Sequence, residues 1–151
     1  MEGERKTGTG READKELQEK VFAYRVIEAR LQALAKERDV IMSKIFETRT
    51  TIASIDEATK SKNNGEIVFH IGSDTYMVGK VSDKGRIIIE VGGNVAMEKT
   101  PEEAKKFLNG RIGDLEASLS ELNREMSQAF SAMDELAPEI QRMMGEQPGS
   151  Q

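Results

Sequence analysis

Residues 66–99 read EIVFHIGSDTYMVGKVSDKGRIIIEVGGNVAMEK, and this stretch decides the fold. Apolar side chains recur in it at every second position, which is the period of a β-strand. Three Gly-containing clusters, at residues 72–74, 83–85 and 92–94, interrupt this pattern and are typical of tight turns. The stretch therefore predicts four short strands arranged as two hairpins.

A long helix is predicted before the strands, over residues 14–56. Positions separated by alternating steps of three and four residues form a row in which eight of ten side chains are apolar. Such a row is the seam of an amphipathic helix. Its members are Tyr24, Ile27, Leu31, Leu34, Arg38, Ile41, Ile45, Thr48, Ile52 and Ile55. We interpret the two polar members, Arg38 and Thr48, as devices that set the pairing register.

A second long helix is predicted after the strands, over residues 100–144. Thr100, Pro101 and Glu103 form a start signal, because a Thr cap, a Pro at the first helical position and a Glu three residues after the cap make a capping box. We expect Pro138 to distort or end the helix locally. The seam is apolar at all eleven positions, namely Leu108, Ile112, Leu115, Leu119, Leu122, Met126, Ala129, Met133, Leu136, Ile140 and Met143.

Two helical arms of one period, joined by a compact insert, predict an antiparallel two-helix coiled coil. Residue numbers that meet across it should sum to about 157, which pairs Leu31 with Met126, Ile45 with Ile112 and Leu17 with Ile140. We treat residues 1–151 as a single unit. Its remaining segments are a flexible N-terminus (1–13), a linker (57–65) and a flexible tail (145–151).

The predicted fold class is therefore α+β, a long coiled coil with two hairpins between its helices. Such hairpins cannot bury a core alone, their open edges invite pairing with other strands, and two helices offer them little cover. We therefore expect an obligate oligomer in which strands of several subunits form a closed sheet. The expected subunit interface is Ile67, Phe69, Ile71, Met77, Ile87, Ile89, Val91, Val95 and Met97.

Composition excludes several classes of function. A net charge of −5 and a pI near 5.1 disfavour nucleic acid, since phosphate backbones are met by excess positive charge. The absence of Cys excludes disulfides and thiolate metal sites and favours the cytoplasm. No stretch approaches the ~18 apolar residues that would span a membrane, and no signal peptide is recognised.

No catalytic constellation is found. His70 is the only His, which excludes His-based triads and His-pair zinc sites. Gly79 and Lys80 are followed by Val81, where a phosphate-binding P-loop needs Ser or Thr. We therefore expect no cofactor, no metal and no enzymatic activity.

One feature exceeds what a coiled coil needs. The last three e positions of the second helix are Phe130, Ala137 and Met144, and Val21, Phe22 and Val26 lie outside the seam at the same end of the first helix. Surplus apolar surface of this kind usually marks a binding site. The alternative is that these residues seal the end of the coil or pack against another subunit. Phe46 and Phe107, also outside the seam, are expected to pack against the strands.

The chain resembles the alpha class of prefoldin subunits. The resemblance covers nearly the whole chain and is most specific from Glu66 onward, in the two Gly-bearing turns, the VGGNVAMEK strand and the EEAKKFL opening of the second helix. Ser73 and Asp74 depart from the small or Gly residues that usually follow Gly72 in this family. Phe69 and His70 depart from it where a Pro is common.

This resemblance implies a hetero-hexamer of two alpha-class and four beta-class subunits, whose hairpins form a double β-barrel platform. It further implies an ATP-independent cytosolic chaperone that captures non-native polypeptides at the coiled-coil tips and delivers them to a group II chaperonin. The implied client contacts are Val21, Phe22, Tyr24 and Val26 on one helix and Phe130, Met133, Ala137, Ile140, Met143 and Met144 on the other. A coiled-coil scaffold or a filament-forming prefoldin relative is the alternative.

Overall fold

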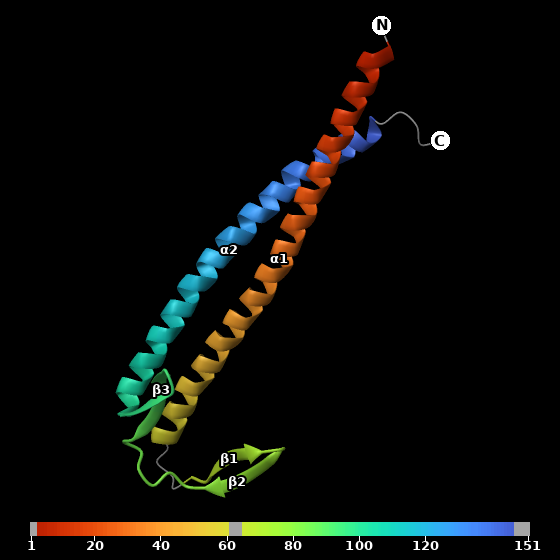
Figure 1. The fold of residues 1–151 in the computed structure, drawn as a ribbon. Helices are drawn as coiled ribbons and strands as arrows, with labels where there is room; N and C mark the ends of the chain where they lie inside the picture. Colours follow the sequence, from red (N-terminus) through yellow and green to blue (C-terminus); the bar gives the residue numbers. More distant parts are fainter. Residues whose placement is uncertain (1–2, 61–64, 147–151) are drawn as a thin grey trace. The chain divides into compact units, whose positions relative to one another are not determined.

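A computed structural model describes residues 3–60 and 65–146 of the chain, with side chains from residue 8 onward. Helix α1 spans Gly3–Lys60 and helix α2 spans Pro101–Gly145. Between them lie four strands, β1 (Ile67–Gly72), β2 (Thr75–Gly79), β3 (Ile87–Gly92) and β4 (Val95–Lys99), as Figure 1 shows. The predicted α+β class, with two hairpins between two long helices, is confirmed.

Helix α1 is longer than predicted at both ends. It begins at Gly3 instead of residue 14 and ends at Lys60 instead of residue 56. The first residues carry no apolar seam, but Arg11, Glu12 and Ala13 are strong helix formers that extend a helix already nucleated. The rest of the predicted linker at 61–64, and the predicted tail from residue 147, lie outside the described residues.

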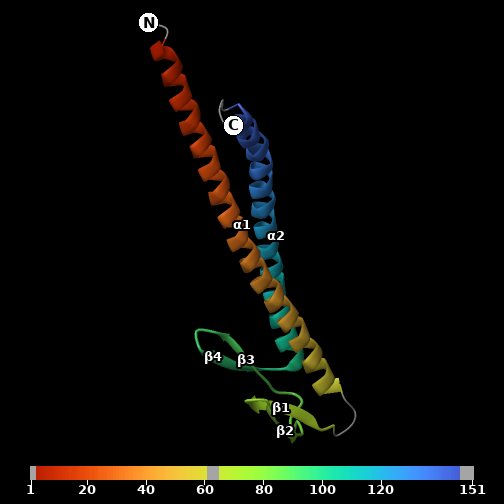
Figure 2. The same cartoon turned by 90° about the vertical axis from the view of Figure 1, so that its right-hand side faces the viewer.

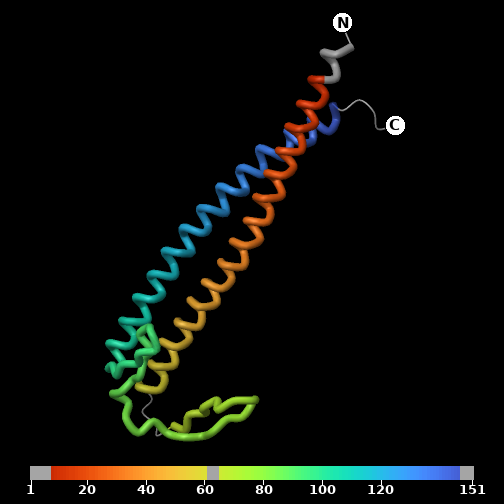
Figure 3. Tube along the Cα trace, in the orientation of Figure 1, coloured from red at the N-terminus to blue at the C-terminus, as the bar shows by residue number. Residues whose placement is uncertain are grey.

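Helix α2 begins at the predicted cap and continues past Pro138. The Thr100 Oγ1 atom accepts a hydrogen bond from the Glu103 N–H at 3.2 Å, and the Glu103 carboxylate accepts one from the Thr100 N–H at 3.0 Å. This reciprocal pair is a capping box. Pro138 lies inside the helix, which runs as one element to Gly145 (Figure 3), so of the two expected effects, distortion or termination, the proline does not end the helix. A proline removes one backbone donor, and the surrounding helical hydrogen bonds maintain the element.

The chain divides into two compact units. The terminal unit contains the described residues of 3–40 and 119–146, and the hairpin unit contains those of 41–118. In the terminal unit the two helical segments run antiparallel, and the start of α1 extends beyond the end of α2 (Figure 2). Leu31, Leu34, Leu122 and Met126 are buried there.

The predicted register holds in the terminal unit and drifts in the hairpin unit. The ion pairs Lys20–Glu139 and Arg30–Glu125 have residue numbers that sum to 159 and 155, close to the predicted 157. In the hairpin unit the Arg49–Glu116 and Asp56–Lys105 pairs sum to 165 and 161.

The two hairpins have the same strand pairing, and their corresponding residues are twenty positions apart in the sequence. Strand β1 pairs with β2 and β3 with β4, each antiparallel, in two separate sheets. The two-residue loops are Ser73 with Asp74 (φ 40° and 55°) and Gly93 with Asn94 (φ 59° each). Positive φ at both loop residues defines a type I′ turn, whose twist matches the strands. The first loop therefore achieves without glycine the geometry that the second achieves with it.

The core of the hairpin unit joins β3 to both helices. Ile55, Ile89, Ala104 and Leu108 form one buried cluster. Ala104 is fully buried, and its small side chain lets the strand approach α2 closely. Further apolar residues that pack against this cluster are Ile52, Ile87, Val91 and Phe107.

Candidate functional site

The ten predicted client-contact residues all lie in the terminal unit. Helix α1 contributes Val21, Phe22, Tyr24 and Val26, and helix α2 contributes Phe130, Met133, Ala137, Ile140, Met143 and Met144. The two groups lie on segments that the Lys20–Glu139 and Arg30–Glu125 ion pairs join. The fold thus gathers into one unit two groups of residues that are about a hundred positions apart in the sequence.

Two ion pairs between the helices test the predicted heptad positions. In an antiparallel coiled coil the g positions of the two helices face each other along one flank, and the e positions face each other along the other. With Leu31 at position a, Arg30 and Glu125 are both g residues, and their side chains meet at 2.6 Å. Arg49 and Glu116 in the hairpin unit are both e residues and also meet at 2.6 Å. Both pairs agree with the predicted heptads.

The heptad positions divide the ten residues into three groups. Tyr24, Met133, Ile140 and Met143 are seam residues and are half-buried. Val21, Phe130, Ala137 and Met144 are e residues on one flank of the coil. Phe22 and Val26 lie on the outer face of α1, opposite the seam.

The residues outside the seam retain large exposed apolar surface. Phe22 is 70% exposed, Phe130 53% and Met144 60%, and Val26 is about half exposed. Val21 and Ala137 are half-buried. The coil therefore does not enclose its own surplus apolar side chains, and this unit presents an apolar surface that other molecules can contact.

The seam itself is not apolar throughout this unit. Lys20 occupies a d position, and its Nζ atom lies 2.5 Å from Glu139 Oε2. This hydrogen bond raises the pKa of Lys20 and lowers the pKa of Glu139. Lys20 was not among the predicted seam residues, because the predicted seam began at Tyr24. Continuing the three- and four-residue steps backward reaches Lys20 and then Leu17.

A model of the prefoldin family, described as prefoldin subunit, matches residues 27–146. The chain belongs to the prefoldin family. Chaperone activity, without catalysis, is the general role of prefoldins, and alpha-class prefoldins assemble with other prefoldin subunits.

Curated relatives of this prefoldin carry the name prefoldin subunit alpha. The protein of Pyrococcus horikoshii is 24% identical over 135 residues, which cover 89% of this chain and 91% of the relative. The protein of Methanosarcina acetivorans is 26% identical over 141 residues, covering 91% and 97%. A cryo-EM structure of filamentous prefoldin from Methanocaldococcus jannaschii shares the fold, with a TM-score of 0.67 and 22% identity over 81% of this chain and 98% of that one.

The nine predicted interface residues of this prefoldin occupy two environments. Phe69, Ile71, Met77, Val95 and Met97 are exposed, and Ile67 is half-buried. Ile89 is only 8% exposed in the core of its own chain, and Ile87 and Val91 pack against that core. The expectation that the two helices offer the strands little cover is therefore wrong for the second hairpin.

Several other apolar residues lie on or near the strands, and some of them were not predicted from the sequence. Val68, Tyr76, Val78 and Ile88 are exposed on the strands, and the continuous apolar runs in β1 and β3 were the available signal, since both faces of such strands are apolar. Phe107 packs against the hairpin core, as predicted, with the Arg111 guanidinium 4.6 Å from its ring centre. Phe46 is 73% exposed and is not packed within its own chain, so its predicted packing against the strand platform of the assembly stays a prediction.

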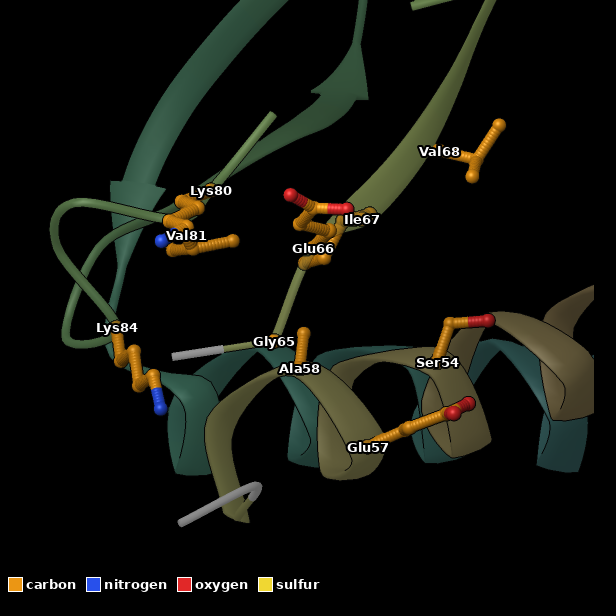
Figure 4. A pocket seen from close by; sticks show the side chains of 10 residues that line it. All are labelled: Ser54, Glu57, Ala58, Gly65, Glu66, Ile67, Val68, Lys80, Val81 and Lys84. Carbon is orange, nitrogen blue, oxygen red and sulfur yellow. The ribbon is translucent and has the colours of Figure 1, made fainter. Parts of the chain in front are cut away.

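A cavity of about 340 Å³ lies in the hairpin unit between the end of α1 and the start of β1 (Figure 4). Glu57, Glu66, Lys80 and Lys84 line it, so both signs of charge are present. No excess of one sign would select a charged ligand, and we assign it no role. Among the described residues there is no group of three or more acidic or His side chains that could hold a metal ion. Neither described helix has a segment long and apolar enough to cross a bilayer.

Proposed function

We propose that this chain is the alpha subunit of an ATP-independent chaperone, and that it binds non-native polypeptides through the apolar residues of its terminal unit. One observation carries the proposal. Phe22 and Val26 on α1, and Phe130 and Met144 on α2, remain exposed in the unit that the ends of both helices form. The family's general role as a chaperone supports this use of the surface.

Weak contacts suit such a chaperone. Burying one apolar side chain of a client contributes on the order of 1 to 2 kcal/mol, so a single subunit would hold an unfolded chain only briefly. Several subunits on one platform raise the effective concentration, and avidity can reach ~10²-fold or more without any stronger contact. Weak individual contacts also allow release without ATP.

The proposed assembly has two alpha-class and four beta-class subunits whose hairpins join in a β-barrel platform. The exposed apolar residues of the first hairpin, such as Phe69 and Met77, support a role for the strands in assembly. The proposed setting is the cytoplasm, and the proposed recipient of the client is a group II chaperonin. Nucleic acid, membranes and cofactors have no part in this proposal.

Light scattering by an aggregating denatured protein tests the proposal. The assembly with full-length chain is compared with one in which the chain is trimmed to about residues 25–128, which keeps the Arg30–Glu125 pair and the buried Leu31, Leu34, Leu122 and Met126. Trimming should preserve assembly and abolish protection. Equal protection by the trimmed form would contradict client binding by the terminal unit.

A structural scaffold is the second candidate. The solved structure from Methanocaldococcus jannaschii is that of a filamentous prefoldin, which makes filament formation a specific alternative for this chain. Electron microscopy of the purified chain, alone and with beta-class partners, separates the two functions. Long filaments without any protection of denatured proteins would favour the scaffold.

A further inference from the structure

The two flanks of the coil in the terminal unit differ in character. The g flank is closed by ion pairs, since Arg30 meets Glu125 at 2.6 Å, and Glu139, also a g residue, meets Lys20 at 2.5 Å. Charged side chains that pair across a flank cover the seam, and between the two ion pairs this flank presents only the small, half-buried g residues Ala23 and Ala132. This flank is therefore unsuited to receiving an apolar segment.

The opposite flank is apolar at its centre. We define the apolar flank as five e residues of the two helices together with one neighbouring carboxylate. Val21 and Glu28 come from α1, and Phe130, Asp134, Ala137 and Met144 come from α2. The predicted register, which the ion pairs confirm in this unit, places Val21 across from Ala137 and Glu28 across from Phe130. Phe130 and Met144 are both more than half exposed.

The carboxylates on the apolar flank lack cationic partners. Asp134 follows Phe130 by one helical turn and precedes Ala137, so it lies within the apolar row. Within the described part of the chain, neither Asp134 nor Glu28 forms an ion pair or a side-chain hydrogen bond. Arg25, one turn before Glu28, does not pair with it either.

Three other carboxylates of α2 in this unit are paired with cations, and Glu135 has no such pair among the residues that the structure describes. Glu121 pairs with Arg124, Glu125 with Arg30, and Glu139 with Lys20. The α2 segment 119–146 contains six acidic residues and two arginines, a balance of −4. Among the described residues, two unpaired carboxylates, Asp134 and Glu28, therefore adjoin the exposed apolar side chains, and they outnumber the one unpaired cation beside them, Arg25.

We propose that the apolar flank is the face that receives a non-native chain, and that it takes apolar segments bearing Lys or Arg in preference to those bearing Asp or Glu. This inference rests on the proposed function. The aliphatic stem of a Lys or Arg can lie along Phe130 and Met144 while its charge approaches Asp134 and Glu28. An acidic segment would place like charges together at the same surface, which disfavours it.

Charge also argues against a second copy of this chain as the occupant. Two identical flanks would bring Asp134 and Glu28 of one copy against the same carboxylates of the other. Like charges in close contact oppose that pairing. A segment of opposite charge, supplied by an unfolded client, is the complementary occupant.

Two fluorescent peptides test the preference. They share one apolar centre and differ only in flanking residues, Lys in one and Glu in the other, and their affinities are measured with the full-length chain in its assembly. Two exposed charge pairs predict about fivefold tighter binding of the Lys-flanked peptide at low salt. The preference should shrink in about 0.5 M salt, where the Debye length is only a few ångströms.

Matched variants assign the preference to this flank. The double variant Glu28→Gln, Asp134→Asn should bind both peptides with affinities within about twofold of each other. The control Glu19→Gln, Glu121→Gln removes the same charge from outer positions of the same unit and should keep the full preference. Loss of the preference in both double variants would show a general charge effect and overturn the assignment.

The remaining outcomes separate this inference from the proposed function. Equal binding of the two peptides by the unmodified chain, together with protection of a denatured protein, would overturn the charge preference and leave the chaperone function intact. Failure to bind either peptide, together with no protection, would overturn both.

Discussion

Lys20 Nζ lies 2.5 Å from Glu139 Oε2, so a seam position of α1 holds a cation that pairs with the flank of α2. The Lys20 side chain is only 25% exposed, which shows that it lies partly inside the coil. The pair joins the two helical segments of the terminal unit through a charged seam position, and its strength must depend on pH.

The sign of the pH dependence follows from the two pKa shifts. The hydrogen bond from Lys20 lowers the pKa of Glu139 below its ordinary 4.5, so its contribution to stability is complete above pH 4.5 and is lost as pH falls through the lowered value. The same bond raises the pKa of Lys20 above 10.5, so that contribution is complete below pH 10.5 and is lost above it.

The Glu139→Gln variant should therefore have a lower melting temperature than the parent at pH 7, and the difference should shrink steadily below pH 4.5. Thermal unfolding followed by circular dichroism measures both. Glu135→Gln, an exposed carboxylate without an ion pair in the described part of the chain, serves as control and should not change the melting temperature at either pH. Identical behaviour of the two variants at pH 7 would contradict a stabilising pair.

The substitution Phe130→Ser should weaken protection of a denatured protein in the light-scattering assay. Phe130 is half exposed, so the free energy of unfolding should change by about 0.5 kcal/mol or less. Phe46→Ser is the matched control, because Phe46 is even more exposed but lies in the hairpin unit. Protection that falls equally in both variants would argue against a site in the terminal unit.

The sequence predicted the secondary structure of this chain well where periodicity was strong. The seam of α2 and the alternating strands gave the right elements, and Thr100 gave the right helix start. The start of α1 was missed because residues 3–13 form a helix without a seam. Periodicity detects only helices that bury a face against a partner.

The sequence predicted which residues form the candidate surface, but it did not predict which side of the coil they share. Heptad counting placed Phe130 and Val21 outside the seam, but which side of the coil is open depends on the register. The register became known only when pairs such as Arg30–Glu125 showed which flank is closed. The docking of β3 onto the helices was missed for a similar reason, since a fully buried Ala104 looks in sequence like any other alanine.

The two turns offer a reciprocal test of backbone strain. Ser73 has φ 40° and Gly93, at the same place in the second hairpin, has φ 59°. A non-glycine residue in this region is disfavoured by about 1 kcal/mol. Ser73→Gly should therefore raise the free energy of unfolding by about 0.5 to 1 kcal/mol, and Gly93→Ser should lower it by a similar amount. Urea unfolding measures both, and effects of the same sign would refute a shared turn type.

Neighbouring isoleucines of β3 should behave differently. Ile89 belongs to the core of its own chain, and Ile89→Ala should lower the free energy of unfolding by about 2 to 4 kcal/mol at every protein concentration. Ile88 is 71% exposed, so Ile88→Ala should act only where assembly contributes, and its effect should vary with concentration. Urea unfolding over a range of concentrations tests this, and similar concentration-independent losses would contradict the packing of β3.

Arg38 should lower the free energy of unfolding relative to an apolar residue at the same position. It occupies a seam position, and its Nε atom is buried without a hydrogen-bond partner among the described residues. Its guanidinium reaches only Asp39, at 3.4 Å. A buried donor without an acceptor is destabilising, and a leucine would add apolar burial at the same place.

Arg38→Leu should therefore raise the free energy of unfolding by about 1 kcal/mol. If Arg38 also sets the register, the variant should gain alternative assemblies, because a fully apolar seam pairs in more than one way. Urea unfolding and native mass measurement give the two readouts, with Lys36→Leu on the outer face of α1 as control. A less stable Arg38→Leu variant would mean that the arginine makes a net favourable contribution in the seam.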